Sequence, residues 1–502
     1  MVRVLTVAGL LACLASGCAS GGSSVGKEAA ADEIKKGGFT VAASCHDPQI
    51  LREGDTYYMF GSHMVGAKCQ DLRKWNYFAN GVDAANTLFD NLLTEPYAAF
   101  DFVGKNTDNG YSVWASNVIY NETMKKYVMY FCTTSSYVKS TLCFATADNI
   151  EGPYTYVDTI LYSGYGKSNI SETNLYDVLG KNADISRYLE YGGYNNKEWP
   201  NCIDPAIFTD ADGRMWMNYG SWSGGIFLLE IDPTTGYPIY PVDDKDADPY
   251  YGYRLIGGGH HSAEGPYIQY DAENGYYYLF VSYGDLQSDG GYQIRQFRSE
   301  KPTGPYVDVA GNTLEDQDDH FNYGLKMMGN YTFPSLNYTY MAPGGQSTFQ
   351  DDDGKYYITY HQRFDDGTEY HEPRVQQMYT NEDGWFVAAP FATMGETLSE
   401  KGYKKSDVSG TFYVVNHGTD ISSKIREAEA YTFADGKVTG GEKSGTYEVK
   451  EGTDYITITL DGVVYKGVLM EMTDEAENPV FCFSAAGDNE ETLWGVQYIK
   501  KE

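Results

Sequence analysis

The 502-residue sequence lacks any stretch rich in lysine and arginine, and its 37 basic side chains stand against 70 acidic ones, for a formal net charge of -33. A surface of this sign repels phosphate backbones and other polyanions. The composition therefore excludes nucleic acid as a partner and favours a neutral ligand over an acidic one.

The sequence also lacks a Cys-x-x-Cys pair and any group of cysteine and histidine with the spacing of a zinc site, so no structural zinc is expected. Six cysteines remain once Cys13 and Cys18 of the N-terminal segment are set aside. Cys132 and Cys143 lie symmetrically about a turn. They either form a disulfide across a hairpin or stay as two buried free thiols.

Long apolar runs are scarce as well: one, from Val4 to Leu14 after Arg3, is too short for a membrane span and suits a secretion signal. The residues ASGC at 15–18 resemble a bacterial lipobox, which predicts a signal peptide over 1–17, lipidation of Cys18 and a flexible tether over 18–39. A generic signal peptide with an incidental cysteine is the alternative. The lipobox interpretation predicts an exported protein that is lipid-anchored to the cell envelope, in the outer membrane of a Gram-negative bacterium.

Tyrosine and glycine are abundant, at 47 and 55 residues, which indicates strands and tight turns. One pattern recurs five times: a polar residue, a short apolar strand, a turn rich in Asp, Asn and Gly, and an aromatic strand. The copies begin at His46, Trp114, Cys202, Glu264 and Gly344. Each has room for two more strands, so residues 40–395 are predicted to form a five-bladed β-propeller in an all-β protein.

Residues 396–502 lack this repeat and consist of short apolar segments separated by Gly/Asp turns. They predict a small C-terminal antiparallel β-barrel or sandwich. Packing support for the propeller and an independent carbohydrate-binding role both suit such an accessory domain.

The first strand of a propeller blade lines the central channel, so the polar residue at its start points to one end of the axis. We predict that five leading residues meet there: Asp47, Asn117, Asp204, Glu264 and Gln346. Three of them are acidic.

Cleavage of a glycosidic bond needs one carboxylic acid to protonate the departing oxygen and one carboxylate to activate water or attack. A third negative charge raises the pKa of the acid.

The acidic motifs resemble those of glycoside hydrolase family 43. They are HDP at 46–48 followed by YYMFGS, IDP at 203–205 followed by YGS and SGG, and EGPY at 264–267 followed by a YYYLF strand. The resemblance covers the propeller with the three motifs in order. The C-terminal module is similar to the one that follows the propeller in extracellular arabinanases of that family.

The resemblance implies that Asp47 is the general base, Glu264 the general acid and Asp204 the residue that orients the acid and tunes its pKa, with inversion of the anomeric configuration. Substrate contacts are expected from neighbouring positions: His46, Trp114, Asn117, Ser221, Trp222, Gly225, His261 and Gln346. Trp114 either stacks on a sugar or is buried in the propeller, and the two histidines either bind substrate or bond the backbone.

The resemblance also implies a Gly-His-Asn-Ser stretch in the fifth blade, whose histidine helps to hold a calcium-centred water cluster. The stretch here is GGQS at 344–347. No metal ligand is therefore assigned, and calcium as a cofactor is left open.

These observations favour a monomeric glycosidase of arabinan, a plant cell-wall polysaccharide, that is endo-acting on α-1,5-L-arabinofuranosyl linkages. An exo-acting α-L-arabinofuranosidase or β-xylosidase is the alternative within the same chemistry. A surface lipoprotein that binds glycans without cutting them is the alternative from another class.

Overall fold

The computed structural model describes residues 25–314 and 320–500, so the predicted signal peptide and Cys18 lie outside the described residues. Within these ranges the one α-helix is α1 (Leu175–Leu179), and no helix has the length and apolar character needed to cross a bilayer. Short 3-10 turns occupy Ala31–Glu33, Ser62–Met64, Ala98–Phe100, Ile170–Glu172, Ser186–Tyr188 and His320–Asn322. The remaining regular structure is β-strand.

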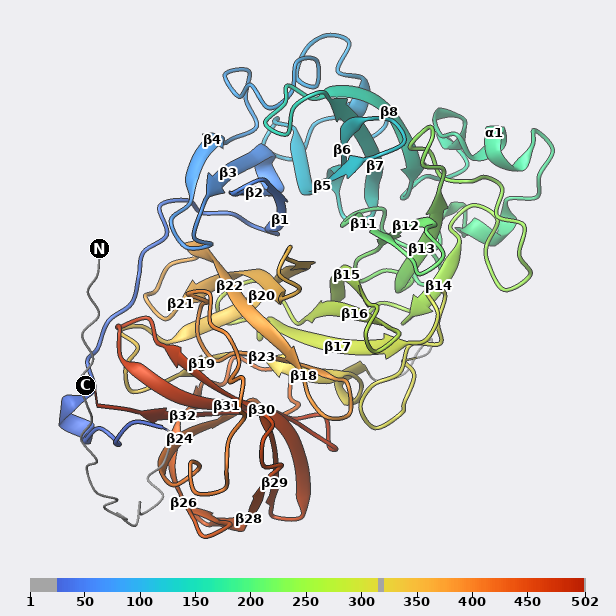
Figure 1. Cartoon of the computed structure of the whole chain (residues 1–502). Coiled ribbons are helices and arrows are strands. Elements are labelled where there is room, and N and C mark those ends of the chain that lie inside the picture. Colours follow the sequence, from blue (N-terminus) through green and yellow to red (C-terminus); the bar gives the residue numbers. More distant parts are fainter. Residues whose placement is uncertain (1–24, 315–319, 501–502) are drawn as a thin grey trace, which may run out of the picture.

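Five antiparallel sheets follow one another around a central axis (Figure 1), which confirms the predicted propeller. Blade 1 consists of β1 (Gln49–Glu53), β2 (Thr56–Gly61), β3 (Val65–Cys69) and β4 (Asn76–Ala79). Blade 2 consists of β5 (Ser112–Asn121), β6 (Lys126–Ser136), β7 (Lys139–Ala147) and β8 (Thr155–Tyr162). Blade 3 consists of β11 (Ala206–Thr209), β12 (Met215–Tyr219), β13 (Ile226–Ile231) and β14 (Tyr253–Ile256).

Blade 4 consists of β15 (Ala263–Asp271), β16 (Tyr276–Tyr283), β17 (Gln293–Ser299) and β18 (Leu325–Met328). Blade 5 consists of β20 (Tyr340–Gln350), β21 (Tyr356–Phe364), β22 (His371–Thr380) and β23 (Phe386–Ala388). Its sheet is extended by β19 (Tyr331–Thr332) and β25 (Arg426–Glu427). A separate pair, β9 (Leu189–Glu190) with β10 (Gly193–Tyr194), lies in the long connection between blades 2 and 3.

Each blade has a residue with positive backbone φ just before or within its innermost strand, a conformation that is rare and strained for residues other than glycine. These five equivalent residues are Asp47 (φ 52°), Ala115 (46°), Asp204 (57°), Gly265 (57°) and Gly345 (57°). They turn the chain into the innermost strands β1, β5, β11, β15 and β20, which surround the axis in Figure 1. The structure thus places Asp47 and Asp204 at equivalent positions.

The other three predicted leading residues do not share that register. Glu264 precedes its positive-φ residue by one position, Gln346 follows its own by one, and Asn117 follows by two. The pairing of β5, β15 and β20 with their neighbours shifts at these points, as a β-bulge requires. A bulge adds a residue without a pairing partner, so similar spacing in the sequence concealed these offsets.

Side chains close the ring between the first and last blades. Arg52 forms an ion pair with Asp351, and the Tyr57 hydroxyl donates a 2.6 Å hydrogen bond to the same carboxylate. Nearer the axis, the Ser347 hydroxyl donates to the Pro48 carbonyl at 2.8 Å. Blade 1 therefore meets blade 5 through polar contacts between two complete sheets.

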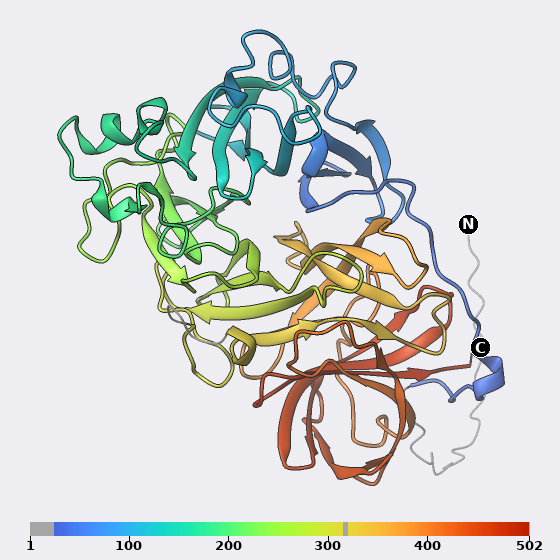
Figure 2. The same cartoon turned by 180° about the vertical axis from the view of Figure 1, so that it is seen from behind.

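The C-terminal unit is a closed eight-stranded antiparallel barrel, which resolves the predicted choice between barrel and sandwich. Its strands are β24 (Gly410–Asn416), β26 (Glu429–Ala434), β27 (Lys437–Gly440), β28 (Lys443–Val449), β29 (Tyr455–Leu460), β30 (Val463–Thr473), β31 (Pro479–Gly487) and β32 (Thr492–Tyr498). Trp494 packs edge-on against Tyr331 of β19, and β25 pairs in parallel with β19. Figure 2 shows the barrel beneath the last two blades.

The described part of the predicted tether is packed onto the folded domains. Val25 is buried in the barrel core, Ala29 donates its N–H to the Tyr498 carbonyl, and Gly37 bridges to Leu336. Flexibility was expected for 18–39 because of the Ser/Gly-rich composition, but from Val25 onward the chain finds partners for its backbone in β32 and blade 5.

The predicted hairpin cysteines do not form a disulfide. Cys132 pairs across the sheet with Leu142, and Cys143 pairs with Phe131. Directly opposed residues share a face and neighbours along a strand alternate, so the two thiols point to opposite faces. All six cysteines in the described ranges are buried and free, which agrees with the free-thiol alternative.

Candidate active site

Asp47 lies at the mouth of the axial channel, just before β1. His46 Nδ1 lies 2.8 Å from its Oδ2, and the Ser62 hydroxyl donates to the same oxygen. Burial raises the pKa of Asp47, but the interactions with His46, Ser62 and His63 outweigh burial and hold that pKa below its usual value. The Asp47 side chain is still 19% exposed. Asp47 is therefore an ionised carboxylate that a solvent-borne ligand can reach.

Glu264 is in β15 and receives three hydrogen bonds from neutral donors. The Tyr292 hydroxyl donates to Oε1 at 2.7 Å, while the Ser221 hydroxyl and Trp222 Nε1 donate to Oε2 at 3.0 and 2.8 Å. Burial, supported by the negative charge of Asp47, raises the pKa of Glu264 above its usual value although these donors oppose it. Glu264 can thus hold a proton at a pH where Asp47 has lost its own.

Asp204 faces both of the other carboxyl groups from the start of blade 3. Its Oδ2 accepts one hydrogen bond, from the Gly265 N–H at 3.1 Å. Burial and then the charges of Asp47 and Glu264 raise the pKa of Asp204 well above its usual value. Asp204 and Glu264 consequently compete for protons, and the ionisation of either one makes ionisation of the other harder.

A cavity of about 40 Å³ lies on the propeller axis, lined by three consecutive residues from the start of each innermost strand. It is large enough for water, which needs about 10–15 Å³. Asn117 and Gln346 are in this lining, as are Asp47 and Asp204. These four leading residues therefore converge at the axis, as predicted. Glu264 lies one residue before Gly265, the first residue of its strand that lines the cavity.

Asn117 and Gln346 have protein partners. Asn117 Oδ1 accepts from the Ile207 N–H at 3.1 Å, which ties blade 2 to blade 3. The Gln346 amide donates to the Gly265 carbonyl and accepts from the Ser282 hydroxyl, both at 2.7 Å. Both side chains are nearly fully buried, so the geometry gives them the role of holding blades together at the axis.

A larger cleft of about 630 Å³ opens beside Glu264. Trp114, Ser221 and Trp222, all predicted to contact substrate, line it. Trp114 is partly exposed and its ring lies 5.8 Å from that of His63. Indole faces beside a carboxylic acid are suited to sugar rings, whose C–H faces are apolar and whose hydroxyl groups form hydrogen bonds.

His260, rather than the predicted His261, lines the cleft. Its Nδ1 lies 2.7 Å from the hydroxyl of Tyr137, and its ring lies 5.4 Å from that of Trp222. The ring of His261 instead packs 4.9 Å from that of His320.

Gly225 and His46 also lie outside the lining of the cleft. A Cβ at Gly225 would come within 2.3 Å of the Ile256 carbonyl oxygen, so this glycine permits a close approach of two backbone segments. His46 reaches the site through Asp47, whose carboxylate it holds.

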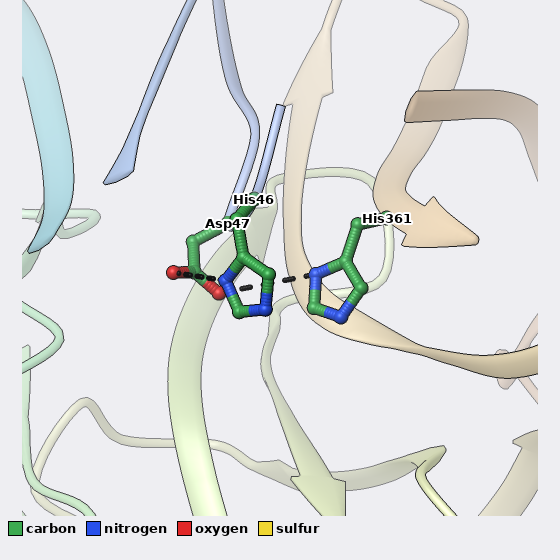
Figure 3. A group of neighbouring side chains, drawn as sticks. All are labelled: His46, Asp47 and His361. Carbon is green, nitrogen blue, oxygen red and sulfur yellow. Dashed lines mark hydrogen bonds and ion pairs between the residues drawn. The ribbon is translucent and has the colours of Figure 1, made fainter. Parts of the chain in front are cut away.

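Three side chains at the edge of the axis form a compact cluster (Figure 3). The ligating atoms of His46, Asp47 and His361 lie within 4.8 Å of one another. His361 is fully buried, its ring stacks on that of His46 with centroids 4.0 Å apart, and neither ring nitrogen has a hydrogen-bond partner among the described residues. Burial lowers the pKa of His361 well below its usual value, so the ring is neutral and able to bind a metal.

His361 lies beside position 345, where the resemblance to family 43 implies a histidine. His361 in β21 pairs with Gly344 in β20, so its ring lies near the axis although it belongs to the second strand of the blade. The family histidine would stand at position 345, where a Cβ would lie 2.3 Å from Asp47 Oδ1 and 2.8 Å from His361 Nδ1. A side chain at 345 and the observed His361 ring therefore exclude each other.

Sequence reasoning missed His361, Tyr292, Tyr137 and His260 as site residues. His361 is the sixth residue of YYITYH, at the same step as Ser62 in YYMFGS, and that alignment could have revealed it. Tyr292 and Tyr137 carry no such signal because the chain holds 47 tyrosines.

The comparisons with known proteins agree with this geometry. The profile of Glycosyl hydrolases family 43 matches residues 178–386, and that of a C-terminal lipocalin-like domain matches residues 390–495. The extracellular endo-α-(1→5)-L-arabinanase 2 of Bacillus subtilis is 38% identical over 467 residues, which are 90% of this chain and 92% of the relative. The chain belongs to glycosyl hydrolase family 43.

Other family 43 proteins match over a similar length. The extracellular endo-α-(1→5)-L-arabinanase of Thermotoga petrophila is 36% identical over 91% of this chain and 94% of its own. Its crystal structure superposes with a TM-score of 0.79, at 35% identity over 93% and 100% of the two chains. The family 43 YxiA protein of Bacillus licheniformis superposes with a TM-score of 0.80, at 36% identity over 92% and 99%. As a member of family 43, the protein is a glycosidase.

Proposed function

We propose that this family 43 glycosidase is an endo-acting arabinanase that cleaves α-1,5-L-arabinofuranosyl linkages. The observation that carries the proposal is the 38% identity, over nine tenths of both chains, to a relative named for that activity. The axial carboxylates and the cleft beside them supply the chemistry for it.

In this mechanism Asp47 is the general base and Glu264 the general acid. Asp47 is ionised because of His46 and Ser62, so it can take a proton from water. Glu264 has a raised pKa and lines the cleft, so it can protonate the departing glycosidic oxygen. Single inversion follows if water attacks from the face opposite to the leaving group.

Asp204 acts on Glu264 rather than on the substrate. Its carboxylate raises the pKa of Glu264 when ionised, and its hydrogen bond from the Gly265 N–H fixes it beside the acid. Trp114 and Trp222 form the walls on which arabinofuranosyl rings pack, and Trp222 also orients Glu264 through its indole N–H.

The cluster around His361 fits a divalent cation. A buried neutral imidazole whose nitrogens have no hydrogen-bond partner in the described part of the chain faces Asp47 Oδ1 at 3.9 Å, and imidazole and carboxylate groups are common ligands for such ions. His361 and Asp47 would hold the ion, and when bound it would supply positive charge next to the carboxylates. The donor set does not select between calcium and a transition metal.

We further propose that the protein is exported and anchored to the outer membrane through a lipid on Cys18, and that it is a monomer. Export is supported by the relatives named extracellular. Mass spectrometry of the mature N-terminus tests the anchor, and light scattering during gel filtration tests the oligomeric state.

The decisive experiment is hydrolysis of linear α-1,5-arabinan, branched arabinan and xylo-oligosaccharides, with product lengths followed over time and the first anomer identified by NMR. The proposal expects oligosaccharides of mixed length from arabinan, released with inverted configuration. Release of arabinose or xylose alone would establish an exo-acting enzyme instead. Binding without turnover would establish a glycan-binding protein.

A further inference from the structure

Another hollow, of about 360 Å³, lies apart from the axial cavity and the cleft, where residues 37–40 run beside blade 5. The Gly37 N–H donates to the Ser335 carbonyl at 2.9 Å, and the Asn337 N–H donates to the Gly37 carbonyl at 3.1 Å. These bonds fix the segment as one wall of the hollow, which we call the blade 5 pocket. Its volume is within the range of about 300–1,000 Å³ typical of small-molecule sites.

The blade 5 pocket and the carboxylate site share one strand. Tyr370, Glu372 and Arg374, which alternate along the start of β22, line the pocket. His371, between them, packs 5.2 Å from the ring of His46. Side chains alternate between the two faces of a strand. One face of β22 therefore serves the pocket and the other supports the histidines beside Asp47.

The pocket offers aromatic surface to solvent. The side chains of Tyr338 and Tyr370 are 57% and 45% exposed, which is unusual for large rings at one site. Tyr338 stands edge-on to Phe364 with centroids 6.1 Å apart, so its ring is supported from behind. Tyr338 lies two positions before β20 and Tyr370 one position before β22, so both are close to the sheet of blade 5.

Acidic groups outnumber basic groups in and around the pocket. Arg374 is buried, with its guanidinium 5.3 Å from the Phe364 ring, and it is paired with Glu372 at 2.8 Å and with Glu475 at 3.9 Å. Its Nε has no hydrogen-bond partner among the described residues. Asp366 adds a carboxylate at the rim, and the whole chain carries a net charge of -33. An anionic ligand is disfavoured, while a neutral ligand with apolar faces and hydroxyl groups is suited to both the rings and the polar groups.

We propose that the blade 5 pocket binds a stretch of neutral pentose polysaccharide away from the cleavage site, with Tyr338 and Tyr370 packing on the sugar rings. The identity of the polymer as arabinan rests on the proposed function. A long chain that occupies both sites is retained more strongly than one that occupies the cleft alone. An oligosaccharide that occupies the cleft alone gains nothing from the pocket.

The test compares the double variant Tyr338→Ala/Tyr370→Ala with the matched control Tyr120→Ala/Tyr191→Ala, which removes two tyrosines that are 40% and 102% exposed elsewhere on the surface. We expect KM for linear arabinan to rise about three- to tenfold in the first variant only, as loss of a second linked site predicts. The kcat for arabinan and both constants for arabinotetraose stay unchanged. Equal KM values for arabinan in both variants overturn the proposal.

A second variant distinguishes the loss of polysaccharide binding from misfolding. Asn337→Trp fills the pocket from its exposed rim without removing a supporting ring, and it should raise KM for arabinan to the same extent. A wild-type KM in a folded Asn337→Trp protein contradicts the proposal.

Retention in gels that contain arabinan, xylan or galactan separates this proposal from the proposed function. It is measured in the Glu264→Gln background, where cleavage does not interfere. If the wild type cleaves no arabinan, retention on arabinan or xylan that depends on the two tyrosines still supports the pocket, and galactan, a hexose polymer, is the negative control. If neither pentose polymer shows such retention, the pocket proposal fails even where arabinan is cleaved.

Discussion

The Tyr292 hydroxyl donates a 2.7 Å hydrogen bond to Glu264 Oε1, on the carboxylate oxygen opposite to the one that Trp222 and Ser221 share. This bond stabilises the ionised form of Glu264 and lowers its pKa against the effect of burial. Tyr292 thus limits how far the pKa of the acid rises.

Tyr292→Phe should raise the pKa of Glu264, because the donor to its ionised form is lost. The alkaline limb of the kcat/KM profile reports deprotonation of the acid, so it should move to higher pH by about one unit. The control is Tyr283→Phe, since the hydroxyl of Tyr283 is buried without a partner among the described residues. An alkaline limb that stays in place, or moves to lower pH, would show that Glu264 is not the group that limits the rate there.

The two proposed catalytic residues should differ in their dependence on the leaving group. Glu264→Gln and Asp47→Asn should each lower kcat on arabinan by about 10²- to 10⁴-fold, the usual contribution of an acid or a base. With a dinitrophenyl arabinobioside, whose leaving group needs no proton, Glu264→Gln should recover most of its activity. Asp47→Asn should not. Equal recovery in both variants would mean that the roles are assigned wrongly.

Asp204→Asn should stabilise the fold at alkaline pH while lowering activity. Burial and two neighbouring charges raise the pKa of Asp204, so between its unfolded value of about 3.8 and its folded value the native state binds more protons than the unfolded state. Stability therefore falls as pH rises through that range. The asparagine variant should have a higher Tm than the wild type at pH 8 and a similar Tm at pH 4. A lower Tm at pH 8 would contradict the pKa direction.

Removal of divalent cations should lower the Tm of the wild type if His361 holds an ion, because a ligand bound only to the native state stabilises it. The measurement is thermal unfolding with EDTA and then with added calcium, manganese or zinc. His361→Gln should abolish the response. His371→Gln, which changes a partly buried histidine with its ring 5.7 Å from His361, is the matched control and should keep it. A response that survives in His361→Gln places the ion elsewhere.

The repeat in the sequence sufficed to predict the propeller, because every blade uses the same alternation of turn and aromatic strand. It also sufficed to bring Asp47 and Asp204 together, since both begin a blade at the same step. The register of the other leading residues was not predictable, because bulges in β5, β15 and β20 shift the pairing by a residue. No local pattern marks a bulge of this kind when the turns also vary in length.

Aligning the blades on their aromatic strands would have located the equivalent positions at the axis more accurately than aligning them on the leading residues. The residue five or six positions after the first residue of each such strand lies opposite the residue before the positive-φ turn: Ser62, Cys132, Gly220, Ser282 and His361. The contacts that set the carboxylate pKa values remain beyond sequence, because they come from several blades at once and from tyrosines that resemble all the others.

The closure of the ring between Arg52 and Asp351 joins residues 299 positions apart, and the proposed catalytic base lies on the same seam, with Asp47 on one side and His361 on the other. Contacts between such distant segments form late in folding, after the entropy of a long loop has been lost. A chain that has folded four blades has therefore produced most of its hydrophobic core before its axial site is closed. The rate at which enzymatic activity returns during refolding would consequently report the rate of the last assembly step. A nascent chain would remain inactive until its fifth blade had been made.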